Sequence, residues 1–129
     1  MNREEVLEYF GKDRYAELTG IEILEASRDH ARTRLKIEPK HLNANDTVMG
    51  GCIYTIADFT FAIAANVDNS DTCTLNSNII FNAPARGGYL YAESNVIKSG
   101  RTIASFEVKV TDDEQRLIAT ATFVGFRKE

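Results

Sequence analysis

Hydrophobic and polar residues alternate over several parts of the chain, most clearly at residues 31–38. Ala31, Thr33, Leu35 and Ile37 fall on one side there, and every residue between them is charged. A period of two predicts a strand with one buried face. The same reasoning predicts five further strands, at 21–26, 73–81, 89–98, 102–110 and 116–126.

The strand pattern also predicts which side chains point inward. In the strand at 73–81 we expect one face to carry Cys73, Leu75, Ser77, Ile79 and Phe81. In the strand at 102–110 we expect an inner face of Ala104, Phe106, Val108 and Val110. Short polar turns join the last four strands, which favours antiparallel pairing between neighbours in sequence.

One long stretch does not alternate. From residue 47 to 67 the only charged side chain is Asp58, and twelve of the sixteen residues from 52 to 67 are apolar. A helix that is apolar all round is usually buried. A membrane span is the alternative, but an Asp at its centre would cost about 2.5–3.5 kcal/mol, so we expect a buried helix in a soluble domain.

Two short helical segments precede this stretch, at 3–10 and at 15–18, the second ended by Gly20. The order is therefore helix, two strands, long helix and four strands, without the alternation of strands and helices that a parallel sheet needs. We predict an α+β fold in which one antiparallel six-stranded sheet wraps around one long buried helix. At 129 residues, the whole chain (1–129) is expected to form a single domain.

Composition and charge exclude several classes of protein. The net charge is −4 and the isoelectric point is near 5.2, so the chain lacks the excess of positive charge that is typical of nucleic-acid-binding proteins. The first residues contain no apolar core of a signal peptide, and we expect a cytoplasmic protein with no membrane partner. Cys52 and Cys73 are then expected as two buried thiols rather than a disulfide. No spacing of ligands typical of a metal site is present.

Asp58 is the first candidate for chemistry, because a desolvated carboxylate is costly unless something requires it. An interior carboxylate held by a helix dipole or an arginine is the structural alternative. Gly50 and Gly51 precede the apolar run, where free N–H groups of a helix N-terminus bind anionic oxygens. They can equally serve only to let helix and sheet approach closely.

The segment from His41 to Asp58 resembles the signature of PaaI-type hotdog acyl-CoA thioesterases, which reads roughly Leu-Asn, a short loop, His-Gly-Gly, four apolar residues and Leu-Ala-Asp. Asn43, Gly50-Gly51 and Asp58 fall in register with it. The resemblance continues through the runs at 81–84 and 99–101 and the closing strands. Met49 departs from it, because the family's usual residue there is His.

The resemblance implies roles for four residues. Asp58 would act as nucleophile or as general base for water, and the Gly50 amide would stabilise the thioester oxyanion. Asn43 would orient water or the acyl carbonyl near the Asp of a partner subunit, although a loop Asn is ordinarily a turn residue. Thr74 lies where some relatives carry a Ser that positions water, but a strand Thr needs no such role.

Substrate contacts follow from the same resemblance. Gly51 and Met49 would border the thioester, and Arg86, Lys98 and Arg101 would hold the phosphates of coenzyme A. Each of these three cations is otherwise a solvated turn charge. Coenzyme A would arrive as part of the substrate, and we expect no separate cofactor.

Two functions remain open from the sequence. The first is an acyl-CoA thioesterase, favoured by Asp58 in register. The second is a hotdog domain that binds acyl-CoA or another acyl ligand without hydrolysing it, favoured by Met49, because a thioether donates no hydrogen bond. The apolar helix and an exposed sheet edge predict a homodimer, paired again into a tetramer as in many relatives of the family.

Overall fold

The computed structural model describes residues 1–128. The chain forms α1 (Arg3–Phe10), α2 (Arg14–Thr19), β1 (Ile21–Ser27), β2 (His30–Lys36), a short 3-10 turn η1 (Pro39–His41), α3 (Gly50–Asn66), β3 (Thr72–Phe81), β4 (Tyr89–Ser99), β5 (Ile103–Asp112) and β6 (Leu117–Arg127). The order and type of the elements are those predicted from the sequence, and the boundaries differ by a few residues.

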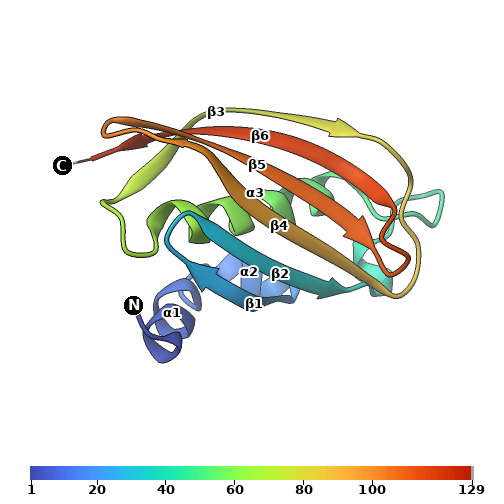
Figure 1. Cartoon of the computed structure of the whole chain (residues 1–129). Helices are drawn as coiled ribbons and strands as arrows, with labels where there is room; N and C mark the ends of the chain where they lie inside the picture. Colours follow the sequence, from blue (N-terminus) through green and yellow to red (C-terminus); the bar gives the residue numbers. More distant parts are fainter. Residues whose placement is uncertain (129) are drawn as a thin grey trace.

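One antiparallel sheet contains all six strands in the order β1-β2-β4-β5-β6-β3. The sheet curls over α3, which lies along its concave face and packs mainly on β2, β4 and β5 (Figure 1). The predicted sheet wrapped around one long helix is therefore confirmed. β1 and β3 are the two edges, and β3 joins the sheet only through β6.

The core forms between α3 and the inner face of the sheet. Phe61 of α3 stacks on Phe123 of β6 with ring centroids 4.7 Å apart, and it meets Phe106 of β5 edge-on at 5.5 Å. The predicted inner face of β5 is confirmed, since Ala104, Phe106, Val108 and Val110 are all fully buried. Alternation gave the right result in the central strands because both of their neighbours hold them in register.

The predicted inner face of β3 is wrong in its first half. A bulge between Thr74 and Asn76 shifts the alternation, and as a result Cys73 and Leu75 are exposed. An edge strand accommodates an extra residue easily because it is paired on one side only. The expectation of two buried thiols fails with it: both cysteines are free, Cys52 is half-buried and Cys73 is exposed.

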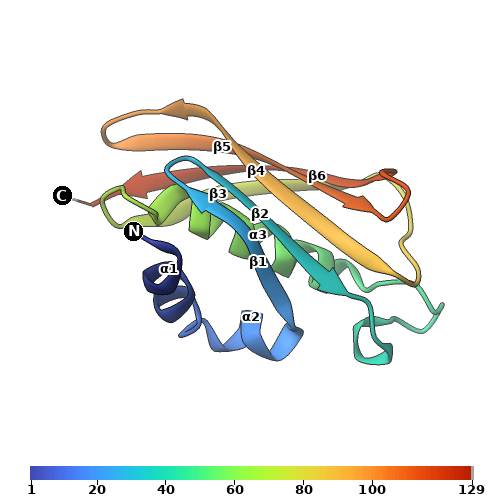
Figure 2. The same ribbon diagram turned by 60° about the horizontal axis from the view of Figure 1, so that its bottom comes forward.

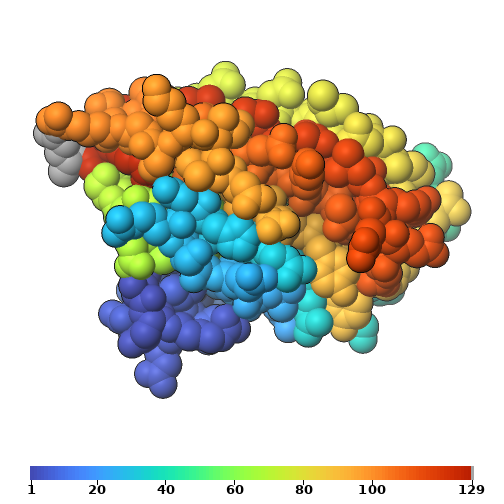
Figure 3. All heavy atoms as spheres, in the orientation of Figure 1, coloured from blue at the N-terminus to red at the C-terminus, as the bar shows by residue number. Residues whose placement is uncertain are grey.

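The two N-terminal helices cover part of α3 on the side away from the sheet. They lie beneath β1 and project from the body of the molecule at one end (Figures 2 and 3). Asn2 caps α1 in a capping box with Glu5, and Gly20 ends α2 in the left-handed conformation, with φ of 96°. Phe10 of α1 meets Phe59 of α3 edge-on, with centroids 6.3 Å apart.

A buried arginine closes the C-terminal end of α3. The Arg127 guanidinium donates to the carbonyl of Ala65 at 2.9 Å, to Thr72 Oγ1 at 3.0 Å and to Ser99 Oγ at 3.0 Å. These bonds satisfy a helix-terminal carbonyl and join β3, β4 and β6 at one point. The sequence pattern did not indicate this contact, because Arg127 is a C-terminal charge with no local partner.

We predict that Arg127→Ala lowers the free energy of unfolding by about 3 kcal/mol, because several buried acceptors lose a charged donor. Urea unfolding at a fixed protein concentration measures it. Arg28→Ala is the control, since Arg28 is exposed in the β1–β2 turn and its loss should change stability by no more than about 0.5 kcal/mol. Equal urea midpoints for the two variants would contradict the structural role of Arg127.

Candidate active site

The loop that leads into α3 is held by backbone bonds and one histidine. The Met49 amide donates to His41 O at 2.9 Å, and the Val48 amide donates to Ala85 O at 2.9 Å. Buried His41 accepts from the Glu38 amide through Nδ1 at 2.9 Å. Its Nε2 must then carry the proton and donates to Thr19 O at 2.7 Å. The start of α3 is thus fixed against α2 and the segment after β3.

The first amides of α3 are available as hydrogen-bond donors. Met49 is the N-cap and offers no side-chain cap, and among residues 1–128 neither the Gly50 nor the Gly51 N–H has a hydrogen-bond partner. A Cβ on Gly50 would lie 3.3 Å from the Phe81 ring, whereas a Cβ on Gly51 would meet no heavy atom within 4 Å. Gly50 is therefore tightly packed, and open space lies beside Gly51.

Asn43 shapes the loop before these amides. Its Oδ1 accepts from the Asn45 amide at 2.9 Å and from the Thr47 amide and hydroxyl at 3.2 Å each. The ordinary turn role of a loop Asn is therefore present. Oδ1 is thus engaged locally, whereas the side-chain NH₂ of exposed Asn43 has no hydrogen-bond partner within the described chain.

Asp58 lies in the third turn of α3 and is half-buried, not enclosed as the sequence suggested. Its pKa is raised above the ordinary value, first by desolvation and second by the nearby Asp13 carboxylate. Asp13 is the N-cap of α2 and comes close only through the packing of α2 on α3. Sequence reasoning missed it because no local pattern links the two positions.

Asp58 belongs to a stripe of α3 that no other part of the described chain covers fully. The stripe consists of Gly51, Thr55, Asp58 and Ala62, which recur at helical spacing and are all exposed or half-buried. The buried residues of α3 lie on its other sides, which face the sheet or the N-terminal helices. The one charged group of the helix thus lies on its one open side.

Gly50 and Asp58 are separated along the helix. Asp58 comes eight positions after Gly50, which corresponds to about 12 Å at a rise of 1.5 Å per residue. One thioester carbon cannot contact both groups of the same chain. The two can meet on one substrate only if they come from different copies of the chain.

Thr74 lies on the exposed edge strand, on the side of the sheet that faces α3, because it pairs with inward-facing Gly125. Thr72 Oγ1 donates to Ala65 O at 3.3 Å, and Ser77 Oγ bonds the Tyr54 hydroxyl at 2.7 Å. Thr74 therefore lies beside the part of α3 that contains Asp58. Its hydroxyl is exposed and is available to a water or a ligand.

The three predicted phosphate-binding cations are not brought together in one chain. Arg86 lies in the loop before β4, whereas Lys98 and Arg101 lie at the β4–β5 hairpin, and all three are exposed. β4 has 11 residues, so its ends are roughly 33 Å apart at about 3.3 Å per residue. Within one protomer, only Lys98 and Arg101 can act on one ligand.

Two surface grooves flank the N-terminus of α3. The α2 groove has a volume of about 520 Å³ and is lined by Tyr15, Leu18, Lys40, Met49, Gly51 and Cys52, among others. The β3 groove has a volume of about 280 Å³ and is lined by Val48, Gly50, Ile53, Phe81, Asn82 and Pro84, among others. Each groove thus reaches one of the two free amides.

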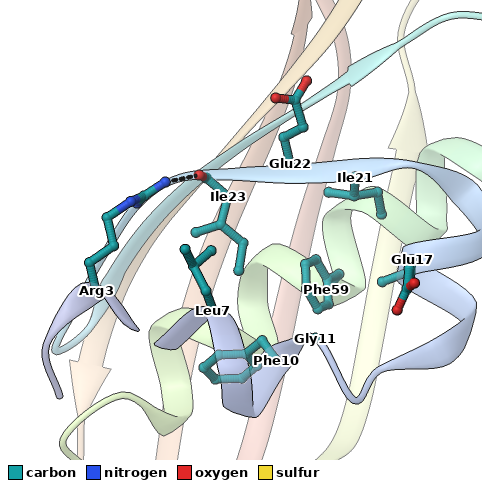
Figure 4. Close-up of a pocket in the computed structure, with 10 residues that line it drawn as sticks. Arg3, Leu7, Phe10, Gly11, Glu17, Ile21, Glu22, Ile23 and Phe59 are labelled. Carbon is teal, nitrogen blue, oxygen red and sulfur yellow. Dashed lines mark hydrogen bonds between the residues drawn. The ribbon is translucent and has the colours of Figure 1, made fainter. Parts of the chain in front are cut away.

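A third cavity lies away from these residues. It has a volume of about 340 Å³ and lies between α1, β1 and Phe59, with Leu7 and Phe10 on one side and Arg3 bonded to Ile23 O at its mouth (Figure 4). None of the predicted site residues lines it.

In residues 1–128 no cluster of His, Cys, Asp and Glu has the arrangement of a metal site. No helix in the same range is long and apolar enough to cross a membrane.

Comparison with known proteins extends this picture. The model of the thioesterase superfamily matches residues 45–119. A putative esterase of Deinococcus radiodurans is 33% identical over 86% of this chain and 75% of that protein. The acyl-coenzyme A thioesterase PaaI of Escherichia coli is 23% identical over 85% of this chain and 79% of that protein.

Solved structures agree on the fold. The Escherichia coli PaaI structure superposes with a TM-score of 0.90 at 22% identity, covering 95% of this chain and 89% of that chain. A hypothetical thioesterase of Streptococcus pneumoniae with coenzyme A superposes with a TM-score of 0.87 at 24% identity, covering 95% and 96%. By its matched residues, its relatives and its fold, the chain belongs to the thioesterase superfamily, in the PaaI-type hotdog family.

Proposed function

We propose that the protein is an acyl-CoA thioesterase whose active sites are built from two copies of the chain. Gly50 and Asn43 come from one copy and Asp58 from the other. The proposal rests mainly on the position of Asp58. This half-buried carboxylate has a raised pKa and lies on the open stripe of α3, about 12 Å from the free amides of its own chain. The relatives named acyl-CoA thioesterases support the reaction class.

The reaction follows from these groups. A water attacks the thioester carbon while Asp58 accepts its proton, and the carbonyl oxygen becomes an oxyanion that accepts from the Gly50 N–H. The oxyanion then re-forms the C=O bond as the C–S bond breaks, which gives the carboxylic acid, and the coenzyme A sulfur takes the proton from Asp58. In the nucleophilic variant the Asp58 carboxylate attacks the carbon itself and the C–S bond breaks, so that coenzyme A leaves as a thiolate and takes a proton from solvent. Water then hydrolyses the resulting anhydride, which releases the acid and restores Asp58. A raised pKa serves the first variant best, because it makes the carboxylate a stronger base.

Asn43 and Thr74 act as positioning groups in this proposal. Asn43 lies in the loop that leads into the Gly50 and Gly51 amides, and its free side-chain NH₂ is oriented by its engaged Oδ1. The exposed Thr74 hydroxyl lies beside the Asp58 segment of its own chain and can bond the attacking water. Arg86 of one copy and Lys98 and Arg101 of the other are the cations available for the phosphates of coenzyme A.

A dimer is the minimal functional unit. The β3 edge is the side on which a second copy completes the sheet, since β3 is unpaired there and exposes Leu75, Ile80 and Phe81. Antiparallel placement of two α3 helices side by side brings Gly50 of one copy level with Asp58 of the other. A further pairing of dimers into a tetramer covers the remaining exposed apolar side chains.

The second candidate function is binding of an acyl-CoA without hydrolysis. Met49 favours it, since the residue at the helix N-cap is 58% exposed and provides no donor to the thioester. Release of free thiol over a panel of acyl-CoAs separates the two functions. Binding of an acyl-CoA without release of free thiol would favour the binding function.

We predict that Asp58→Asn lowers the rate of thiol release by about 10²–10⁴-fold and leaves the fold intact, because the proton acceptor is lost and the shape is kept. Circular dichroism and light scattering check the fold and the assembly. Asp68→Asn is the matched control, since Asp68 is exposed beyond the end of α3. A variant Asp58→Asn with nearly wild-type turnover would remove Asp58 from the mechanism.

A second prediction concerns pH. Asp58 must be deprotonated to act, so activity rises with pH through its pKa, and Asp13 helps to hold that pKa up. Asp13→Asn should move the acidic limb of the kcat/KM profile to lower pH without restoring the ordinary pKa of an Asp, since desolvation is the larger cause and remains. Asn caps a helix as well as Asp does, and the α2 start should be retained.

The control for this shift is Glu17→Gln, which removes the same charge from the same helix at an exposed position. Its acidic limb should coincide with that of the wild type. If Asp13→Asn leaves the limb in place, or if both variants shift it equally, the specific coupling of Asp13 to Asp58 is wrong.

A further inference from the structure

The cavity beneath α1 is apolar inside and is separate from the predicted site residues. Leu7 and Phe10 of α1, Ile21 and Ile23 of β1 and Phe59 of α3 form its walls (Figure 4). Phe10 and Phe59 meet edge-on and are almost fully buried. The volume of about 340 Å³ falls in the range of ligand sites, since an apolar cavity of about 150 Å³ already holds benzene. This α1 cavity therefore has room for a phenyl ring with a short side chain.

The backbone groups around the α1 cavity are already paired. The Gly11 amide donates to Leu7 O at 2.9 Å, and the Glu17 amide donates to Asp13 O at 3.1 Å. The interior thus offers a ligand apolar contacts but few hydrogen bonds. Recognition of a polar or charged end of the ligand is left to the side chains at the mouth.

Arg3 is the positively charged group at this mouth. Its Nη2 donates to Ile23 O at 3.0 Å, which holds the side chain against β1 (Figure 4). Among residues 1–128 the guanidinium has no other hydrogen-bond acceptor and no salt bridge. Because a guanidinium carries five N–H donors and can bind both oxygens of a carboxylate at once, the mouth suits a carboxylate.

The cavity is also lined by two glutamates, and neither opposes a carboxylate beside Arg3. Glu22 lies on the outer face of the sheet, because neighbours on a strand alternate sides, and its Oε1 accepts from Arg34 Nε at 3.2 Å. Figure 4 shows its carboxylate directed away from Phe59. Glu17 comes from α2, at the opposite end of the cavity from Arg3 (Figure 4). The Arg3 end of the mouth is thus positively charged.

We propose that the α1 cavity binds a free carboxylic acid with an apolar body, with its carboxylate on Arg3 and its body against Phe10 and Phe59. This site goes beyond the proposed function and does not depend on it. An acyl group still attached to coenzyme A has no carboxylate and would leave Arg3 without an anion. The ligand is therefore a separate molecule, of the chemical class that thioester hydrolysis releases.

Isothermal titration with three compounds of one shape tests the charge of the ligand. They are 3-phenylpropanoate, 3-phenylpropan-1-ol and 3-phenylpropylamine, which at neutral pH carry a negative charge, no charge and a positive charge on the same apolar body. For the wild-type protein we expect the acid to bind about tenfold more tightly than the alcohol, since hydrogen bonds between charged groups are the stronger ones. The amine should bind most weakly.

Two variants test the place of the site, and thermal unfolding checks that each is folded. Arg3→Gln removes the charge and keeps good helix propensity, and it should weaken binding of the acid about tenfold, to the level of the alcohol. Leu7→Trp puts a larger side chain at the cavity wall and should abolish binding of both compounds. Arg14→Gln and Tyr9→Trp are the matched controls, because both residues are exposed and neither lines the cavity.

Equal binding of acid and alcohol by the wild-type protein, tighter binding of the amine, or no binding of the acid would each overturn the assignment. Acid that binds Leu7→Trp as well as the wild type occupies another site, the active site included, and overturns it too. Loss of a phenylpropyl-CoA thioether in Leu7→Trp, with acid binding unaffected by Arg3→Gln, would show an acyl pocket instead. Absence of thiol release from every acyl-CoA refutes the proposed function and leaves this site standing.

Discussion

The structure depends on one constraint: α3 is apolar on most of its surface, but the sheet covers only one side of it. α3 has buried apolar side chains on most of its circumference, and a curled six-stranded sheet encloses only the concave side. The N-terminal helices cover a second side through contacts such as Phe10 on Phe59. One stripe stays open, and the single charged residue of the helix lies on it. Partial desolvation of the Asp58 carboxylate on this stripe raises its pKa and costs folding free energy, which is the kind of local cost that proteins accept at functional sites.

The same helix imposes the separation on which the proposed intermolecular site rests. Its N-terminus provides free amide donors and its third turn provides the carboxylate, and the rigid rise of an α-helix keeps them about 12 Å apart. No side-chain motion closes that distance. An acyl transfer that needs both groups must therefore recruit a second chain, and the unpaired edge of β3 offers the place. In the proposed function, assembly and chemistry therefore both follow from this one separation.

Much of the fold was predictable because periodicity and turn residues report local structure directly. The apolar run gave α3, and alternation gave the inner face of β5. Alternation did not predict the inner face of β3 correctly, because a bulge in an edge strand leaves no mark in the hydrophobic pattern. The register of Asn43, Gly50 and Asp58 indicated the candidate site. Contacts made only by tertiary packing were not predictable, such as Asp13 beside Asp58 and Arg127 at the end of α3.

The shared site is tested most directly by mixing two defective subunits. Asp58→Ala and Asn43→Ala chains, coexpressed with different tags or exchanged in solution, form heterodimers in which one site of two keeps both residues. Random pairing makes about half of the dimers mixed, so the account predicts recovery of about a quarter of the wild-type rate of thiol release, well above either parent. A mixture that stays at the average of the two parents, with heterodimers present, would contradict the shared site.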